Sequence, residues 1–321
     1  MILPKNNTYM KKRLLVISAF LFTFSGGVMA QQDKLITHFI YDKMSVNPGA
    51  TGFDRDLCAT LMYRNQWDKV NGAPNSVVFN LEANMRRWFP GGLGLSFYHD
   101  AIGFNRQNNL LLNYSYPLDI GSAGTLGIGV GIGMINFGQN PTWVPPTTQN
   151  DISLPVGFNS TNLDLNFGLY FKGNADWYAG ISSTHLSESL LKKKINNVDH
   201  AYQTKRHYYI MGGKTFNNIG KDGKIDLQAL IRTEFTKFSA DINARYIWRD
   251  MLYGGITYRT IDAVGLMVGY MPINGLVISY SYDITTNKLA SVSRGSHEIA
   301  LRYCYKLPPV PIQTSRHPRW L

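Results

Sequence analysis

Residues 238–248 have the sequence FSADINARYIW, in which apolar and polar side chains alternate almost without exception. Because successive side chains of a β-strand point to opposite faces, this stretch predicts a strand with one apolar face and one polar, charged face. Residues 76–85 and 163–172 show the same alternation. The sequence therefore predicts a sheet whose two sides face different environments.

Fourteen such segments follow one another along the chain. We predict strands at 57–64, 75–85, 92–99, 106–116, 124–137, 161–172, 177–183, 207–215, 225–234, 238–248, 252–259, 263–270, 276–282 and 297–305. The odd-numbered links include the longest ones, whereas most even-numbered links are short, with 216–224 as the exception. In an up-and-down meander all odd links lie at one end. This pattern predicts an all-β, antiparallel transmembrane barrel with short periplasmic turns and long external loops.

A soluble β-sandwich is the alternative, because its strands also alternate. Two observations favour the membrane barrel: the apolar face carries almost no charge, and aromatic residues gather at the strand ends of the short-link side. These aromatics are Trp88, Phe89, Tyr116, Tyr246, Trp248, Tyr270, Tyr303 and Tyr305. The opposite face would line the lumen with Glu82, Asp164, Arg232, Glu234, Asp241, Arg245, Glu298 and Arg302. No later stretch reaches the eighteen apolar residues that a membrane helix needs.

The first thirty residues have the features of an export signal. Basic residues at 11–13 precede an apolar run at 14–24, and Val28-Met29-Ala30 is a typical cleavage site. We predict a signal peptide at 1–30, a pre-barrel segment at 31–56, the barrel at 57–305 and a proline-rich tail at 306–321. Removal of Lys5, Lys11, Lys12 and Arg13 lowers the formal charge from +11 to +7. An exported chain with dispersed basic residues is a poor candidate for nucleic-acid binding.

No cofactor or metal site is expected. The seven histidines offer no pair at a metal-ligand spacing, and two cysteines cannot form a four-thiolate zinc site. Ser96, His99 and Asp100 invite a comparison with outer-membrane hydrolases, but three residues of one local segment do not define a nucleophile, a base and an orienting group. We therefore predict a protein that is not an enzyme, with a barrel hydrolase as a distant alternative.

The run GIGVGIG at 127–133 places glycine at every second position. Because no helix pattern follows, a phosphate-binding loop is disfavoured. As a strand, the run directs Ile128, Val130 and Ile132 outward and leaves bare glycine on the inner wall, where another backbone can come close. Either the segment 31–56 or a partner peptide would pack there; simple relief of crowding at a curved strand explains the pattern equally well. The glycines are Gly127, Gly129, Gly131 and Gly133.

The two cysteines, Cys58 and Cys304, lie on the first and last predicted strands, both near the short-link end and both on the inner face. Barrel closure makes those strands neighbours, so a disulfide across the closing pair is possible in the oxidising periplasm. It requires Cα atoms within about 7 Å, which a single register shift would prevent. Two separate small buried residues are the alternative.

The tail contains four prolines, which exclude a helix or a central strand. It would leave the barrel on the periplasmic side. Its residues Arg316, Arg319 and Trp320 suit docking to a soluble partner. A passive, disordered end is the alternative.

Several short motifs occur in order along the chain. They are HFIYDKMSVNPGATG at 38–52, YRNQW at 63–67, GAP at 72–74, GLGL at 92–95, DAIG at 100–103, YAGIS at 178–182, HL at 185–186, RHYY at 206–209 and SHEI at 296–299. With them, residues 31–305 resemble the PorP/SprF family of type IX secretion membrane proteins of Bacteroidetes-type bacteria. The family commonly has Ala-Tyr-Ala-Gly after Asn-Pro, whereas this chain has Gly49-Ala50-Thr51-Gly52.

The resemblance implies an outer-membrane component of the secretion and gliding machinery, with no catalytic residues. Implied partners are periplasmic ring proteins and lipoproteins, including a peptidoglycan-binding lipoprotein, secreted adhesins and membrane lipid. A passive outer-membrane porin is the second interpretation.

Overall fold

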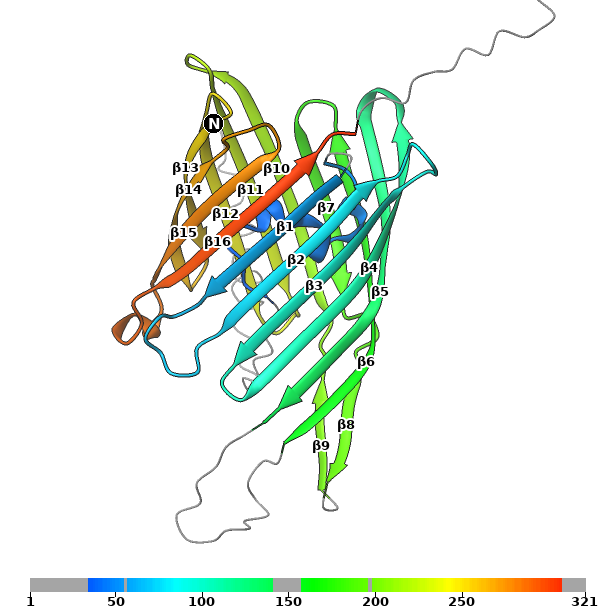
Figure 1. Cartoon of the computed structure of the whole chain (residues 1–321), viewed down its shortest axis with the longest axis vertical. Helices are drawn as coiled ribbons and strands as arrows, with labels where there is room; N and C mark the ends of the chain where they lie inside the picture. The colour runs from blue at the N-terminus through cyan, green and yellow to red at the C-terminus, as the bar shows by residue number, and fades with distance from the viewer. Residues whose placement is uncertain (1–33, 55–56, 141–156, 196–197, 308–321) are drawn as a thin grey trace, which may run out of the picture.

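The computed structural model describes residues 34–54, 57–140, 157–195 and 198–307. Within them, fourteen antiparallel strands close a barrel, as predicted (Figure 1). These strands are β1 (Leu57–Asn65), β2 (Asn75–Asn84), β3 (Gly92–Ile102), β4 (Asn105–Ile120), β5 (Gly124–Gln139), β6 (Phe158–Gly173), β7 (Trp177–Thr184), β10 (His207–Ile219), β11 (Gly223–Thr233), β12 (Phe238–Trp248), β13 (Leu252–Arg259), β14 (Ala263–Tyr270), β15 (Leu276–Thr285) and β16 (Ser296–Tyr305). Closure pairs both sides of every strand within the spanning part of the barrel, which is what a membrane-spanning sheet requires; the outer end of β6 extends beyond its pairing with β7.

The outward face of the barrel is apolar and the inward face is polar. On β12, Ile242 is 55% exposed, whereas its neighbours Asp241 and Asn243 are completely buried in the lumen. All eight aromatic residues expected at the short-turn end are exposed there. They form one girdle of the kind that flanks the apolar band of outer-membrane barrels. Among the described residues, no helix has the length and apolarity that a membrane crossing needs.

The structure corrects three local predictions. The long link 184–206 contains a hairpin, β8 (Leu190–Ile195) and β9 (Val198–Gln203), which forms a separate two-stranded sheet beyond the barrel (Figure 1). The link 216–224 is largely strand, because β10 and β11 pair as far as Ile219 and Gly223 with an irregularity after Phe216. Glu234 is not on a strand face but in the turn that follows β11.

Residues 34–54, hereafter the plug, lie inside the barrel (Figure 1). The plug consists of three short helical turns, η1 (Phe39–Tyr41), α2 (Lys43–Val46) and η2 (Pro48–Ala50). Two further 3-10 turns, η3 (Gly121–Ala123) and η4 (Lys288–Ser291), lie in links between strands. Most plug side chains are buried, so the plug supplies much of the molecule's interior. The short-turn end, where β1 begins and β16 ends, is called the mouth below.

Candidate functional site

Hydrogen bonds to a buried carboxylate attach the plug to one wall of the lumen. Glu298 of β16 is completely buried and accepts hydrogen bonds from the backbone N–H groups of Thr37 (2.8 Å) and His38 (2.7 Å). His38 Nδ1 lies 2.7 Å from the same carboxylate, and Arg64 Nη1 donates a hydrogen bond to it at 2.9 Å. A buried charge is stable only when it is paired and hydrogen-bonded. The plug supplies three of these four contacts to Glu298, and Arg64 supplies the fourth.

The same network continues around this wall. Arg64 Nη2 lies 2.8 Å from Asp283 Oδ2, which also accepts a hydrogen bond from Thr37 Oγ1 at 2.6 Å. Arg259 of β13 contacts Asp241 of β12 at 2.9 Å through Nε. The wall formed by β1 and β12–β16, hereafter the charged wall, thus carries carboxylates and guanidinium groups that pair with one another and with the plug.

One part of this network has the connectivity of a catalytic triad. His38 lies between Glu298 and Ser279, with its Nε2 atom 2.6 Å from Ser279 Oγ. Ser279 Oγ also donates to the carbonyl of Val268 at 3.0 Å, and the serine is only 2% exposed. A nucleophile must reach its substrate, so this buried set is structural in the present arrangement.

The alternative hydrolase set does not assemble. Ser96 and Asp100 face the lumen on β3, and Asp100 accepts a hydrogen bond from Ser76 at 2.6 Å. His99 points to the outer face, as strand alternation requires, and lies 2.7 Å from Asn108 Oδ1. In the described ranges, no group of three His, Cys, Asp or Glu side chains could hold a metal ion.

A second wall, formed by β4–β7, holds the plug by close backbone packing and is hereafter the glycine wall. A Cβ atom at Gly49 would lie 2.9 Å from backbone atoms of Gly127, Gly168 and Tyr170. A Cβ atom at Gly129 would likewise collide with Pro48 and Gly49. Glycine is needed on both sides of this contact because the two backbones touch.

The predicted glycine run therefore divides into two parts. Gly127 and Gly129 contact the plug, whereas a Cβ atom at Gly131 would meet the side chains of Asn113 and Asn166. A Cβ atom at Gly133 would collide with the backbone of the neighbouring strand at Leu110. Of the four glycines, Gly127 and Gly129 are the ones in contact with the described part of the segment 31–56, residues 34–54.

Polar groups of the plug and the glycine wall fix the register of this packing. Asn47 is completely buried; its Oδ1 accepts from Gly49 N–H at 2.9 Å, and its Nδ2 donates to the carbonyl of Leu169 at 3.0 Å. Ser182 Oγ donates to the carbonyl of Val46 at 2.6 Å, and Ser115 Oγ to that of Gly49 at 2.8 Å. Sequence reasoning assigns no role to Asn47 or His38, because their partners on the barrel wall are more than a hundred residues away.

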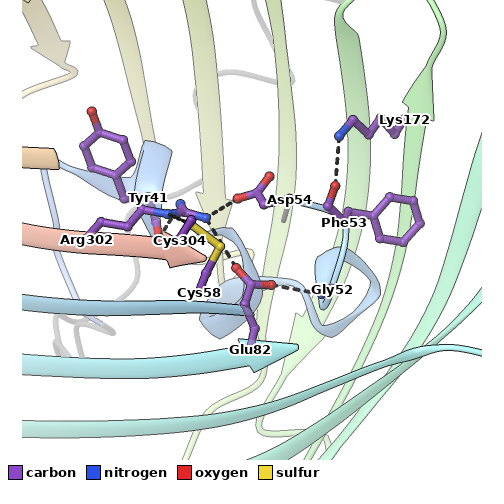
Figure 2. The surroundings of a disulfide bond; sticks show 9 residues. All are labelled: Tyr41, Gly52, Phe53, Asp54, Cys58, Glu82, Lys172, Arg302 and Cys304. Carbon is purple, nitrogen blue, oxygen red and sulfur yellow. Dashed lines mark hydrogen bonds and ion pairs between the residues drawn. A yellow bond between two sulfur atoms is a disulfide. The ribbon is translucent and has the colours of Figure 1, made fainter. Parts of the chain in front are cut away.

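The strands that close the barrel are joined covalently near the mouth. Cys58 and Cys304 are directly opposite in the β1–β16 pairing and form a disulfide, with Cα atoms 4.0 Å apart (Figure 2). Both residues are buried. The bond therefore lies inside the lumen wall, at the point where the first and last strands meet.

The end of the plug is tied to the same place. Arg302 pairs with Asp54 and with Glu82, and Glu82 Oε2 accepts a hydrogen bond from Gly52 N–H at 2.9 Å (Figure 2). Lys172 donates to the carbonyl of Phe53 at 2.8 Å. Burial opposes the ionisation of Asp54, but the charges of Arg302, Lys43 and Lys172 outweigh it and lower the pKa of the Asp54 carboxyl below its usual range.

A pocket of about 570 Å³ lies at the mouth, between the plug and the surrounding strands. Its apolar side includes Ile247, Met271 and Val277. Its charged groups are Lys43, Lys172, Lys224, Arg245 and Arg302, against Asp54, Asp226 and Asp250. The mouth therefore combines an apolar surface with an excess of positive charge.

The predicted docking residues Arg316, Arg319 and Trp320 follow β16 and lie outside the described residues, as does the predicted signal peptide.

The profile of the type IX secretion system membrane proteins PorP/SprF matches residues 28–303. The chain belongs to this family. The match covers the plug and the barrel, so the plug motif at 38–52 lies within the part that defines family membership. None of the curated proteins matches the chain.

Solved structures similar to this PorP/SprF member are outer-membrane barrels. The CymD monoaromatic hydrocarbon channel is 12% identical, with a TM-score of 0.52 over 83% of this chain and 93% of that one. Omp33 of Acinetobacter baumannii is 6% identical, with a TM-score of 0.46 over 79% and 100% of the two chains. The P. putida toluene transporter TodX is 8% identical, with a TM-score of 0.44 over 82% and 93%. At such identities the likeness to CymD concerns the fold alone.

Proposed function

We propose that this protein is a non-enzymatic, non-conducting outer-membrane component of type IX secretion, which docks periplasmic partners at its mouth. The observation that carries the proposal is the plug, because a diffusion pore needs a continuous aqueous path through the lumen. The plug occupies that space and is attached on two opposite sides, by hydrogen bonds to buried carboxylates at the charged wall and by backbone contact at the glycine wall.

The plug also disfavours a passive porin. Removal of the plug from the lumen would leave Glu298 and Arg64 without Thr37 and His38 as partners. Glu298 would keep Arg64 but lose three hydrogen bonds, and this loss would disfavour an open state. The likeness to CymD adds no support for conduction, since it concerns the fold.

The mouth is the surface best suited to periplasmic docking. Short turns of outer-membrane barrels face the periplasm, so the pocket and the start of the tail at Lys306 lie on that side. Its apolar surface and excess of lysine fit a partner segment with apolar and acidic side chains. We place in this role the ring proteins, a peptidoglycan-linked lipoprotein or a segment of an exported adhesin. A cleaved signal at residues 1–30 would deliver the chain.

Affinity purification from native membranes tests this proposal. We expect secretion proteins to co-purify with the wild type and to be lost from the double variant Lys172→Glu with Lys224→Glu, which reverses charge at the mouth. The matched control is Lys237→Glu with Lys288→Glu, in the β11–β12 and β15–β16 links at the opposite end. Equal recovery of periplasmic partners with both double variants would contradict docking at the mouth. Deletion of the tail, residues 306–321, is a separate test of Arg316, Arg319 and Trp320.

A further inference from the structure

The outer face of β4, β5 and β6 changes character in three successive rows toward the long-link end. The registers of the three strands place Leu110, Met134 and Leu163 side by side in the first row; these residues are 47%, 62% and 54% exposed. The second row is Asn108, Asn136 and Thr161, and the third is Arg106, Gly138 and Asn159. Each row lies two residues, or about 7 Å, farther along the strands.

Hydrogen bonds hold the polar rows in place. His99 Nδ1 on β3 lies 2.7 Å from Asn108 Oδ1, and Asn108 Nδ2 lies 3.4 Å from Asn136 Oδ1. Asn136 Nδ2 donates to Thr161 Oγ1 at 2.8 Å and also to Asn159 Oδ1. A continuous polar ladder therefore crosses four strands on the outside of the barrel.

The third row is hollow. A pocket of about 450 Å³ is lined by Arg106, Asn108, Asn136, Gly138 and Asn159. Gly138 lies directly between Arg106 and Asn159 in the pairing. A Cβ atom there would be 3.6 Å from Asn159 Nδ2, an ordinary contact distance, so a side chain at this position is sterically allowed and would occupy the hollow.

This polar surface is not a general property of the barrel end. On the other side of the barrel, β12–β14 remain apolar on their outer face up to the same end. Phe238 and Tyr258 are 56% and 51% exposed, and Val264 pairs with Tyr258. β4, β5 and β6 are 16 residues long, against 11, 8 and 8 for β12, β13 and β14, so the polar sector of β3–β6 is a local extension of the barrel wall beyond its apolar band.

We propose that this sector binds the headgroup of an outer-leaflet glycolipid. Long loops of such barrels face the cell exterior, so the three rows run from the acyl region into the headgroup region of the outer leaflet. Acyl chains would lie along Leu110, Met134 and Leu163. The amide groups of Asn108, Asn136 and Asn159 offer both donors and acceptors, which match sugar hydroxyl groups. Arg106 Nη1 donates to the carbonyls of Gly103 and Asn105, and the other N–H groups of its planar guanidinium would bind a phosphate on the sugar.

Native mass spectrometry of the purified full-length barrel tests this assignment. The probes are an acylated, phosphorylated glucosamine disaccharide, its dephosphorylated form, and phosphatidylglycerol. We expect the wild type to bind the phosphorylated glycolipid at least about tenfold more tightly than phosphatidylglycerol. Gly138→Ile fills the hollow and should remove most of this preference. Arg106→Gln should weaken binding of the phosphorylated form only.

Gly254→Ile is the matched control, because Gly254 is an exposed strand glycine and a Cβ atom there would have no neighbouring atom within 4 Å. It should bind both lipids as the wild type does. Asn136→Leu is a second variant of the site, in case Gly138→Ile does not fold, as judged by heat-modifiable electrophoretic mobility. Equal binding of glycolipid and phosphatidylglycerol by the wild type, or unchanged glycolipid binding by the folded site variants, would overturn the proposal.

Discussion

The charged wall and the glycine wall hold the same plug by opposite physical means. At the charged wall, Glu298, Arg64 and Asp283 contact the plug through long polar side chains. At the glycine wall, Gly127 and Gly129 let the plug backbone touch the barrel backbone. Hydrogen bonds to buried charged groups specify one position because a displaced plug loses them, whereas glycine only permits proximity. The two walls should therefore respond differently to substitution.

The largest effect is expected at the charged wall. Glu298→Ala removes the acceptor of four hydrogen bonds from Thr37, His38 and Arg64 and leaves the Arg64 charge partly uncompensated. We expect the free energy of unfolding in detergent micelles to fall by about 3 to 5 kcal/mol. Glu234→Ala, in the turn after β11, is the control and should change it by less than about 0.5 kcal/mol. If Glu298→Ala lowers the free energy of unfolding as little as Glu234→Ala does, the charged wall does not hold the plug.

The covalent closure of the barrel comes next. Cys58→Ser with Cys304→Ser removes a cross-link between residues 246 apart in sequence. We expect a loss of about 2 to 4 kcal/mol in the same unfolding measurement, while the plug stays in place because its hydrogen bonds to Glu298 and Asp283 remain. Mass spectrometry of the unreduced wild type should find no free thiol. Two free thiols there would contradict the disulfide.

A smaller loss is expected at the glycine wall. Gly129→Ala places a Cβ atom against Pro48 and Gly49, and we expect it to cost about 1 to 3 kcal/mol through overpacking. Gly212→Ala is the matched control, because its Cβ atom would lie 3.5 Å from the nearest carbonyl oxygen. If both substitutions have the same effect on unfolding, backbone contact at Gly129 does not constrain the plug.

The smallest effect is expected at the mouth. Asp54 has a lowered pKa, mainly because Arg302 and other cations outweigh its burial, so its pairing stabilises the fold above the ordinary carboxyl pKa of about 4 and is lost as the pH falls below it. The side chain is partly exposed, and Asp54→Asn should therefore cost about 1 kcal/mol or less at neutral pH. The difference between wild type and variant should shrink on acidification. A difference that grows below pH 4 would reverse the assigned sign.

The barrel could be predicted from sequence because its signal is local. Alternation at 238–248 assigns each side chain to a face without knowledge of the neighbouring strand. The hairpin β8–β9 escapes prediction because LLKKKI at 190–195 does not alternate. The asparagine-rich stretch after Phe216 has the composition of a loop, although β10 extends through it to Ile219, which pairs with Gly223. Local pattern therefore identifies strands best where one face meets lipid.

The site was less predictable because its contacts are non-local. The inward glycines at 127 and 129 indicated a close approach, but nothing in the plug sequence shows that Asn47 would cap its own turn while it donates to Leu169. The pairing of His38 with Glu298 likewise depends on the closed barrel. The polar ladder of Asn108, Asn136 and Thr161 becomes visible only when the strand registers are known.

Single-channel recording of the purified wild-type protein in planar lipid bilayers tests the central claim most directly. A plug held by both walls predicts no stable open-pore conductance for the wild type, and openings in the double variant Glu298→Ala with Gly129→Ala. Steady conductance by the wild type, unchanged in that variant, would contradict the claim that residues 34–54 close the lumen.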